Sequence, residues 1–372
     1  MKRIALVGGG TGGHFYPLMS VAEHIRGQYD ISEVEIVYLG PEPYDQSELD
    51  RNFIQFVKCP AGKQRRYFSL LNFTDMFKTL WGIFVAIWKL YVLYPDVVFS
   101  KGGYTSVPVV LAAFFLRIPI VIHESDSVPG RANKLAAPLA RYIAISFKET
   151  IDFFPAKKTA LIGVPIRLDI LNEYENPMEK LGLPEDKPVI FVTGGSSGAD
   201  RLNTLILQSL DELLPEYTIL HQTGTKSELE VRQTASLLIK DDSLLKYYFV
   251  KGNLSSKEMS LALSSASLVV SRAGSGTIYE IASKRKPSIL IPIPEEISHD
   301  QRSNAYAYAR NGAAEVLEEG NIADGLLYSR INKIMNEPNR YEKMKQSTKE
   351  FLHTDPGSQI AKVLLGIAKE HL

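Results

Sequence analysis

Residues 3–14 read RIALVGGGTGGH, a short apolar run that passes directly into a glycine-rich turn. An apolar run bounded by glycines predicts a buried strand, and the turn predicts a helix start whose amides can face an anionic ligand. The pattern recurs at residues 188–198, PVIFVTGGSSG. Between and after these turns, Val- and Ile-rich runs alternate with helical patterns, as in βα units around a parallel sheet. The sequence therefore predicts an α/β protein in two similar halves.

The length of 372 residues also favours two domains, because it exceeds what one hydrophobic core usually supports. In the first half we predict strands at residues 3–7, 35–39, 96–100, 118–122 and 142–145. In the second half we predict strands at residues 188–193, 218–221, 248–250, 268–271 and 288–291.

The periodicity lapses between residues 163 and 177, where we place the domain boundary. We expect an N-terminal domain at residues 1–165, a C-terminal domain at 166–350, and a C-terminal helix at 351–372 that packs back toward the N-terminal domain. Ligands of parallel α/β sheets bind beyond the carboxyl ends of the strands. We therefore expect two Rossmann-like domains that face each other across a cleft.

Composition excludes several classes of protein. Lys and Arg together number 42, as do Asp and Glu, so the net charge of zero gives no support to a nucleic-acid binder. Cys59 is the single cysteine, which excludes a disulfide framework and a Cys-rich metal site. The first strand passes into glycine too early for a signal peptide, so a cytoplasmic protein is expected.

One apolar stretch, LWGIFVAIWKLYVLY at residues 80–94, invites a membrane interpretation. It contains Lys89 and is shorter than the ~20 residues that span a bilayer, so we expect it to touch a membrane without crossing it. Basic residues precede it at Lys63, Arg65 and Arg66, as suits an anionic surface. The alternative is that the helical spacing of its aromatic residues marks the core face of a domain.

The first glycine turn alone is a weak signal. Gly8, Gly10 and Gly13 match the GxGxxG spacing of dinucleotide-binding folds, and Glu42 follows the second strand, where a dehydrogenase binds ribose. A nicotinamide-dependent oxidoreductase is therefore one alternative. Glycines serve equally well wherever backbone must approach a phosphate or a sugar.

The stretch SRAGSGTIYE at residues 271–280 is more informative. It predicts a strand end, a turn at Gly274 and Ser275, and a helix that carries Glu280. A carboxylate there can accept both hydroxyls of a ribose while the turn amides face a diphosphate. The alternative is an exposed glutamate that the helix N-terminus favours without any ligand.

Five motifs occur in one order along the chain: GGTGGH followed by Pro17, GGYTSVP at 102–108, His123-Glu124 with PG at 129–130 and NK at 133–134, GGSSGA at 194–199, and SRAGSGTIYE. Together they resemble the MurG family of N-acetylglucosaminyltransferases, from residue 4 to about residue 317.

The resemblance implies a GT-B fold with the acceptor in the N-terminal domain and UDP-N-acetylglucosamine mainly in the C-terminal one. The implied reaction is an inverting transfer to the C4 hydroxyl of undecaprenyl-diphospho-MurNAc-pentapeptide, lipid I, which gives lipid II for peptidoglycan. The implied location is peripheral, at the cytoplasmic face of the cell membrane, with other cell-wall synthesis proteins as candidate partners. No cofactor is implied, and the absence of an Asp-x-Asp pattern predicts no obligatory metal.

The resemblance also assigns roles to residues. Glu280 matches the carboxylate that binds the UDP ribose, Ser197 a turn residue near the phosphates, and Arg167 a linker arginine at the donor diphosphate. Thr11, Asn133 and Gln301 match residues that contact the donor sugar. The remaining candidates for substrate binding lie in the three glycine turns, at Gly12, Gly13, Gly195, Ser196, Gly274 and Ser275.

Transfer needs anion stabilisers for the departing UDP and a base for the acceptor hydroxyl. His14 is our first candidate for the base, because an imidazole titrates near neutral pH and this one lies in the first glycine loop. Glu124 is the second candidate. The alternative for His14 is that it only holds the loop.

Two departures from the family pattern bear on specificity. Ser125-Asp126 stands where the family usually has Gln-Asn, and Asp300-Gln301 stands where it has His-Gln or Gln-Gln. An altered sugar preference is therefore one expectation. Another GT-B enzyme acting on a UDP-sugar, such as an epimerase, and a non-catalytic UDP-sugar binding protein are the remaining alternatives.

Overall fold

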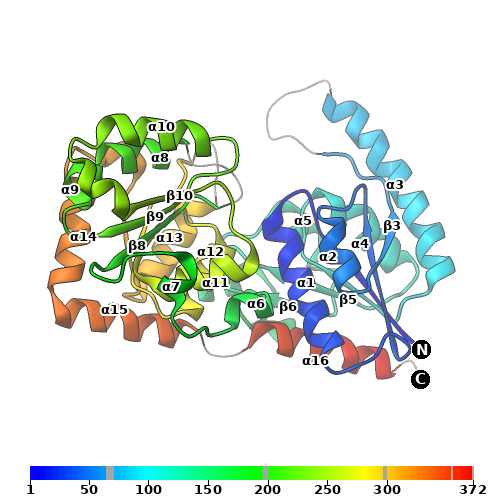
Figure 1. The fold of residues 1–372 in the computed structure, drawn as a ribbon. Coiled ribbons are helices and arrows are strands. Elements are labelled where there is room, and N and C mark those ends of the chain that lie inside the picture. Colours follow the sequence, from blue (N-terminus) through cyan, green and yellow to red (C-terminus); the bar gives the residue numbers. More distant parts are fainter. Residues whose placement is uncertain (64–70, 196–199, 296–299, 353–354, 371–372) are drawn as a thin grey trace. The chain divides into compact units, whose positions relative to one another are not determined.

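The chain folds as two compact units. The computed structural model describes residues 1–63, 71–195, 200–295, 300–352 and 355–370. Unit 1 comprises Met1–Arg167 and Thr354–Leu372, and unit 2 comprises Leu168–His353. Each unit has a parallel sheet with helices on both sides (Figure 1).

The described residues of unit 1 form a seven-stranded sheet in the order β3-β2-β1-β4-β5-β6-β7. Its strands are β1 (Lys2–Val7), β2 (Val34–Gly40), β3 (Gln55–Lys58), β4 (Val97–Ser100), β5 (Ile120–Glu124), β6 (Tyr142–Ile145) and β7 (Thr159–Leu161). All pairs are parallel, and β1 lies between β2 and β4. The strands therefore end at one edge, where the loops after the neighbouring strands β1, β4 and β5 lie side by side.

Helices cover both faces of this sheet. They are α1 (Gly12–Arg26), α2 (Gln46–Arg51), α3 (Leu71–Leu93), α4 (Val107–Phe115), α5 (Arg131–Ala136) and α16 (Pro356–Glu370). On one face, α1 and α16 share a core that includes Leu18 and Leu364 (Figure 1). Gly357 makes their contact possible, because a Cβ there would lie 2.5 Å from the ring of His24. On the other face, Leu90 of α3 and Val109 of α4 belong to a second core.

Helix α3 is longer than the sequence suggests. Residues Phe73–Leu93 are long and apolar enough to cross a membrane by length and composition. The expectation that this segment is too short to span a bilayer is therefore wrong, because the apolar helix begins well before residue 80. A single helix of this kind is weak support for a span, and α3 buries Ala86 and Leu90 against its own unit.

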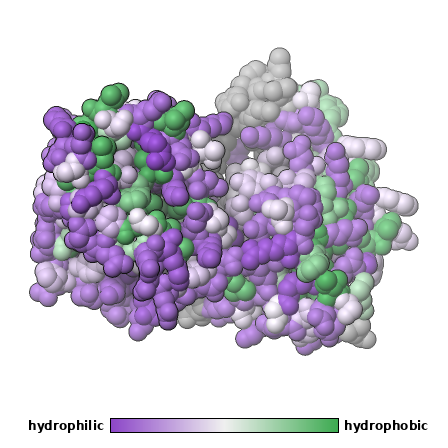
Figure 2. All heavy atoms as spheres, in the orientation of Figure 1, coloured by the Kyte–Doolittle hydropathy of each residue, from purple (hydrophilic) through white to green (hydrophobic). Residues whose placement is uncertain are grey.

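The opposite face of α3 is exposed. Trp81 is 65% exposed, Phe84 67% and Trp88 64%, so a core-face interpretation of these three side chains is wrong. Figure 2 shows apolar residues along this edge of the molecule. The basic residues Arg65 and Arg66 lie outside the described residues.

The described residues of unit 2 form a six-stranded parallel sheet in the order β10-β9-β8-β11-β12-β13. Its strands are β8 (Val189–Thr193), β9 (Thr218–Gln222), β10 (Tyr248–Lys251), β11 (Ala266–Ser271), β12 (Ser288–Leu290) and β13 (Ala314–Val316). Its helices are α6 (Leu168–Leu171), α7 (Pro177–Leu181), α8 (Asp200–Gln208), α9 (Leu210–Leu213), α10 (Glu228–Leu238), α11 (Ser256–Ser265), α12 (Ser275–Ser283), α13 (Gln301–Arg310), α14 (Leu326–Asn336) and α15 (Pro338–Phe351).

All ten predicted strands are present, and no strand end is shifted by more than two residues. The prediction missed β3, β7 and β13, which lie at sheet edges. These strands are three or four residues long and mostly half-buried or exposed. They lack the continuous apolar run by which a buried strand is recognised.

Candidate active site

Three loops meet at the carboxyl edge of the unit 1 sheet. The loop after β1 carries Thr11 and opens α1 with Gly12, Gly13 and His14. Glycine permits its close contact with the next loop, because a Cβ on Gly8 would lie 2.7 Å from the Cβ of Lys101.

The loop after β4 also needs glycine where it meets the loop after β5. Gly102 has a φ of +88°, and a Cβ there would lie 2.9 Å from the side-chain amide of Asn133. The glycine pattern thus brings His14, Lys101 and Asn133 into one cluster with Glu124.

His14 is a neutral imidazole whose pKa lies below the near-neutral value expected from the residue type. Its Nδ1 lies 2.8 Å from Oγ1 of Thr11, and no described residue hydrogen-bonds its Nε2. Burial lowers the pKa of His14 to about 4, the Lys101 cation lowers it further, and Asp126 opposes the shift. The ring is therefore uncharged at pH 7 while it remains partly open to solvent.

Glu124 is buried and holds the loop that follows β5. Its Oε1 accepts a hydrogen bond from the backbone N–H of Asp126 at 3.0 Å. Its Oε2 accepts from the N–H of Gly130 at 3.0 Å and from Nδ2 of Asn133 at 2.9 Å. Burial and Asp126 raise the pKa of Glu124 to about 7, although Lys101 and the hydrogen bonds oppose this shift. Three N–H donors suit a carboxylate that positions the loop more than one that meets a substrate.

Asn133 is buried beside Glu124. Its Nδ2 also donates to the carbonyl of His123 at 3.0 Å, so both amide hydrogens are used within the protein. Its Oδ1 has no hydrogen-bond partner among the described residues. That oxygen is itself buried, so the described contacts of Asn133 hold the loop.

Arg167 ends the first segment of unit 1 and stacks on an aromatic side chain. Its guanidinium lies 4.2 Å from the ring centroid of Tyr16 in α1. The ring of Tyr16 in turn contacts those of Phe15 and Tyr44. Arg167 therefore places its charge over the face of an aromatic ring of α1.

A second set of candidates lies at the carboxyl edge of the unit 2 sheet. Gly195 follows β8, and its N–H donates to Oγ1 of Thr193, whereas Ser196 and Ser197 lie outside the described residues. Gly274 precedes α12 and Ser275 begins it. Glu280 is half-buried in the second turn of that helix.

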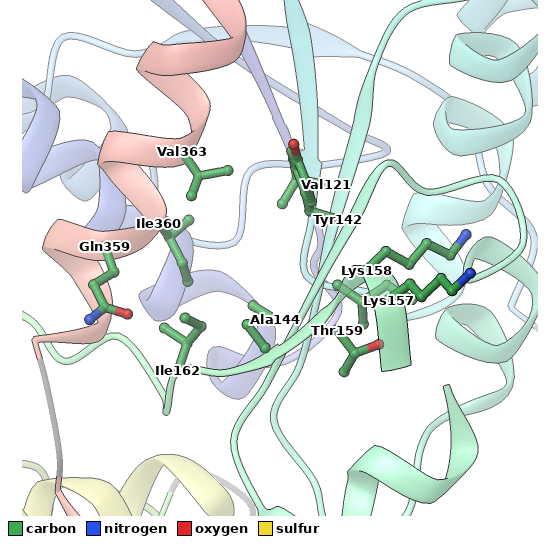
Figure 3. Close-up of a pocket in the computed structure, with 12 residues that line it drawn as sticks. Val121, Tyr142, Ala144, Lys157, Lys158, Thr159, Ile162, Gln359, Ile360 and Val363 are labelled. Atoms are coloured by element: carbon green, nitrogen blue, oxygen red, sulfur yellow. The ribbon is translucent and has the colours of Figure 1, made fainter. Parts of the chain in front are cut away.

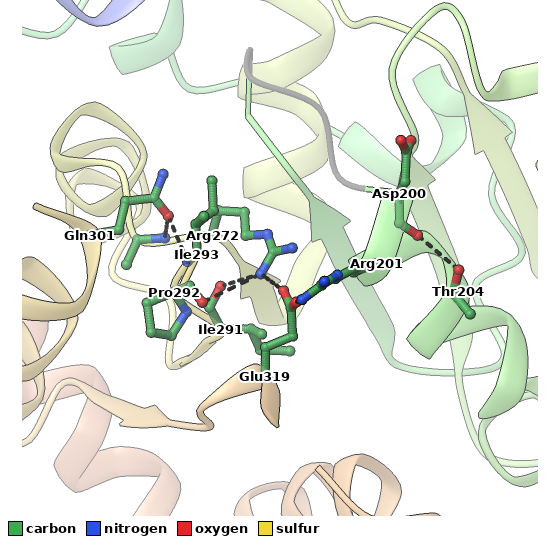
Figure 4. Close-up of polar contacts among 10 residues, drawn as sticks. Asp200, Arg201, Thr204, Arg272, Ile291, Pro292, Ile293, Gln301 and Glu319 are labelled. Atoms are coloured by element: carbon green, nitrogen blue, oxygen red, sulfur yellow. Dashed lines mark hydrogen bonds and ion pairs between the residues drawn. The ribbon is translucent and has the colours of Figure 1, made fainter. Parts of the chain in front are cut away.

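Gln301 begins α13, and its orientation is set by backbone groups. Its Oε1 accepts hydrogen bonds from the N–H groups of Ala273 and Ile293, both at 3.2 Å (Figure 4). Only the carbonyl oxygen of an amide side chain can accept, so the assignment of oxygen and nitrogen is unambiguous. Nε2 is therefore the donor end of the Gln301 side chain and lies opposite the end fixed by the backbone.

Arg272 was not among the sequence candidates, although it stands inside the SRAGSGTIYE motif. It is 5% exposed, pairs with Oε2 of Glu319 at 2.6 Å, and donates to the carbonyl of Ile291 (Figure 4). Arg201 contacts the other oxygen of Glu319. Burial opposes ionisation of Glu319, yet the hydrogen bonds from Arg201 and Arg272 lower its pKa. This cluster fixes the strand end beside the Gly274 turn.

A cavity of about 200 Å³ in unit 1 lies away from these groups. Apolar side chains of β6 and α16, such as Ala144 and Ile360, line it (Figure 3). Lys158 points away from it and donates to the carbonyl of Ala137. The cavity reaches the beginning of β6 and β7, whereas the candidate residues follow the strand ends.

Comparison with known proteins identifies the family. The models of the glycosyltransferase family 28 N-terminal and C-terminal domains match residues 4–145 and 189–356. A Clostridium botulinum protein named UDP-N-acetylglucosamine–N-acetylmuramyl-(pentapeptide) pyrophosphoryl-undecaprenol N-acetylglucosamine transferase is 35% identical over 345 residues, which is 92% of this chain and 93% of the relative. A Clostridium kluyveri protein of the same name is 36% identical over 93% of this chain and 95% of its own. The chain belongs to the MurG family.

Solved structures agree in fold. MurG of Acinetobacter baumannii has a TM-score of 0.75 and 24% identity over 98% of this chain and 100% of its own. A Staphylococcus aureus MnaA structure with UDP has a TM-score of 0.71 at 15% identity, over 99% of this chain and 98% of its own. Both units are Rossmann-like domains of the GT-B class. Because epimerases share this fold, the MurG sequence relatives, not the fold, separate the MurG family from that alternative.

Proposed function

We propose that this chain transfers N-acetylglucosamine from UDP-N-acetylglucosamine to the C4 hydroxyl of lipid I, giving lipid II. The observation that carries the proposal is the match to transferases named for this reaction over 92% of the chain. Both halves of the required chemistry have candidate residues, a neutral imidazole in unit 1 and a glycine turn followed by a carboxylate-bearing helix in unit 2.

In unit 1, His14 acts as the base. In the tautomer whose Nδ1–H donates to Oγ1 of Thr11, the lone pair of Nε2 takes the proton from the acceptor hydroxyl. The hydroxyl oxygen forms its bond to the anomeric carbon as the bond to the UDP oxygen breaks, with inversion. UDP leaves with the bonding electrons. Glu124 serves by holding the loop that carries Asn133.

In unit 2, the amides at Gly274 and Ser275 stabilise the diphosphate, and Glu280 accepts the ribose hydroxyls. Arg167 adds a cation for the departing charge. Nε2 of Gln301 donates to an oxygen of the donor sugar, because its Oε1 is already used.

The test is transfer of labelled N-acetylglucosamine to a short-chain lipid I analogue, with and without EDTA. Transfer that survives EDTA and is lost in Glu280→Ala supports the reaction and its independence of metal. Glu230→Ala, an exposed glutamate on α10, is the matched control and should transfer normally. UDP binding without transfer by the unaltered chain would contradict the proposal and favour a binding role.

We also propose that the exposed face of α3, defined by Trp81, Phe84 and Trp88, contacts the cytoplasmic membrane surface. The three exposed side chains form an apolar patch of the kind that marks an interaction surface. Aromatic side chains also favour the interfacial region of a bilayer. Lys78 and Lys89 on the same helix suit anionic head groups. The acceptor is itself a lipid, so this contact would bring the enzyme to its substrate.

A further inference from the structure

A charged cluster of Arg201, Arg272 and Glu319 lies in unit 2 (Figure 4). Nη1 of Arg272 lies 2.6 Å from Oε2 of Glu319. The other carboxylate oxygen, Oε1, accepts a hydrogen bond from Nη1 of Arg201 at 2.7 Å. The side chains of Arg272 and Glu319 are 6% and 11% exposed, whereas that of Arg201 is 70% exposed. Glu319 therefore neutralises a guanidinium that is withdrawn from solvent.

The three residues come from loops that follow different strands of the sheet. Arg272 follows β11 directly, and Arg201 is the second residue of α8, the helix after β8. Glu319 begins the short 3₁₀ turn Glu319–Asn321 after β13. In the sheet, β12 lies between β11 and β13. Glu319 thus joins the loop after the edge strand β13 to residues that follow β11 and β8, all at the carboxyl edge.

The contact with Glu319 fixes the direction of the Arg272 side chain. Nη1 carries two hydrogens, and the same nitrogen also donates to the carbonyl of Ile291 at 3.1 Å, in the loop after β12 (Figure 4). Removing the carboxylate would leave a buried guanidinium without its counter-charge, which is strongly unfavourable. Arg272 would then have to move toward solvent, and the loops after β11 and β12 would lose the contact between them.

The turn beside Arg272 is the one to which we assign the donor diphosphate. The N–H of Ala273 donates to Oε1 of Gln301, which also accepts from the N–H of Ile293. Gly274 and Ser275, whose amides face the phosphates in the proposed function, follow directly. The turn is thus held both by this amide side chain and by the arginine that precedes it. A shift of the arginine would change the direction of the turn amides.

We propose that Glu319 is a positioning residue for the donor diphosphate, because its carboxylate holds Arg272 and thereby orients the amides of Gly274 and Ser275. Arg201 holds the second oxygen of the same carboxylate. This inference rests on the proposed function of the Gly274 turn. Glu319 acts through Arg272 and not by contact with the substrate.

The test compares the binding of UDP and of uridine to the full chain, by calorimetric titration for UDP and by competition for uridine. Glu319→Gln keeps the size of the side chain and removes its charge. We expect the Kd of UDP to rise about tenfold, the equivalent of one hydrogen bond to a charged group. The Kd of uridine should stay unchanged, because uridine has no phosphates. A general loosening of unit 2 would weaken both ligands alike.

Glu315→Gln is the matched control. Glu315 lies in β13, its side chain is 17% exposed, and it also pairs with two arginines, Arg330 on α14 at 3.7 Å and Arg340 on α15. Both variants should lower the midpoint of urea unfolding, but only Glu319→Gln should change the ratio of the two Kd values. An unchanged ratio in Glu319→Gln, or an equal change in Glu315→Gln, would overturn the role of Glu319.

Glu280→Ala separates this inference from the function on which it rests. Because Glu280 is assigned to the ribose, its loss should weaken UDP and uridine together. If Glu280→Ala weakens both and Glu319→Gln leaves the ratio unchanged, the positioning role alone fails. If Glu280→Ala weakens neither, the assigned donor site fails and this inference with it. Should Glu319→Gln not fold, Glu319→Asp against Glu315→Asp makes the same comparison, because the shorter side chain withdraws the carboxylate from its arginines.

Discussion

Replacing the exposed aromatic face of α3 should release the enzyme from membranes. The variant is Trp81→Ser, Phe84→Ser, Trp88→Ser, which changes side chains that are 65%, 67% and 64% exposed. An aromatic side chain has a surface of about 200 Å², of which about two thirds is exposed at each of these positions. If half of the exposed area enters lipid, the three side chains together bury roughly 200 Å² of apolar surface. At about 25 cal/mol per Å² this corresponds to about 5 kcal/mol.

The expected result is therefore a loss of vesicle affinity of at least about a hundredfold, allowing for incomplete insertion. Sedimentation with vesicles containing anionic phospholipid measures it. Leu229→Ser, Leu237→Ser is the control, because these α10 side chains are 66% and 85% exposed in unit 2. Both variants should bind UDP as the unaltered chain does. Vesicle binding that survives in the aromatic variant, or falls equally in the control, would refute the reasoning.

Four further predictions concern the site. Burial lowers the pKa of His14 to about 4, below its value in the unfolded chain, so a pH profile of kcat/KM should stay level from pH 7 down to about 5.5. The contribution of His14 to folding stability should fall as the pH falls from 6.5 to 4, which urea unfolding measures. Gln301→Glu keeps an acceptor for the two backbone N–H groups but replaces the outward donor with a negative oxygen, so KM for UDP-N-acetylglucosamine should rise at least about tenfold with unchanged melting temperature. Tyr16→Leu removes the ring beneath Arg167, and the same KM should rise about fivefold, the equivalent of about 1 kcal/mol. Glu124→Ala leaves three N–H donors without their acceptor, so urea unfolding at pH 7.5 should report a loss of about 3 kcal/mol; an unchanged midpoint would contradict the positioning role.

The sequence predicts local structure well where the signal is local. Buried strands such as β1 and β8 are continuous apolar runs bounded by glycine, and both appear in the structure. Edge strands such as β3 form because a neighbouring strand offers free backbone groups, which no short polar sequence reveals. The exposed stripe of α3 has the spacing of a core face, and only packing against α4 decides which side is buried.

The candidate site divides in the same way. Five ordered motifs determine the family, and with it the glycine turns and the positions of His14 and Glu280. Nothing in the sequence near Lys101 or Arg272 states that either is buried, because the residues they contact, such as Gly8 and Glu319, are distant in the chain. The orientation of Gln301 likewise depends on two backbone groups from other loops.

The sequence by itself thus determined the α/β class, the two halves and the family, since these depend on periodicity and on residues adjacent in the chain. Only the tertiary structure decided that His14 is neutral, that Glu124 holds a loop, and that α3 leaves an aromatic face uncovered. The reason is physical. Burial, charge and hydrogen-bond direction arise between groups that the fold brings together from separate loops.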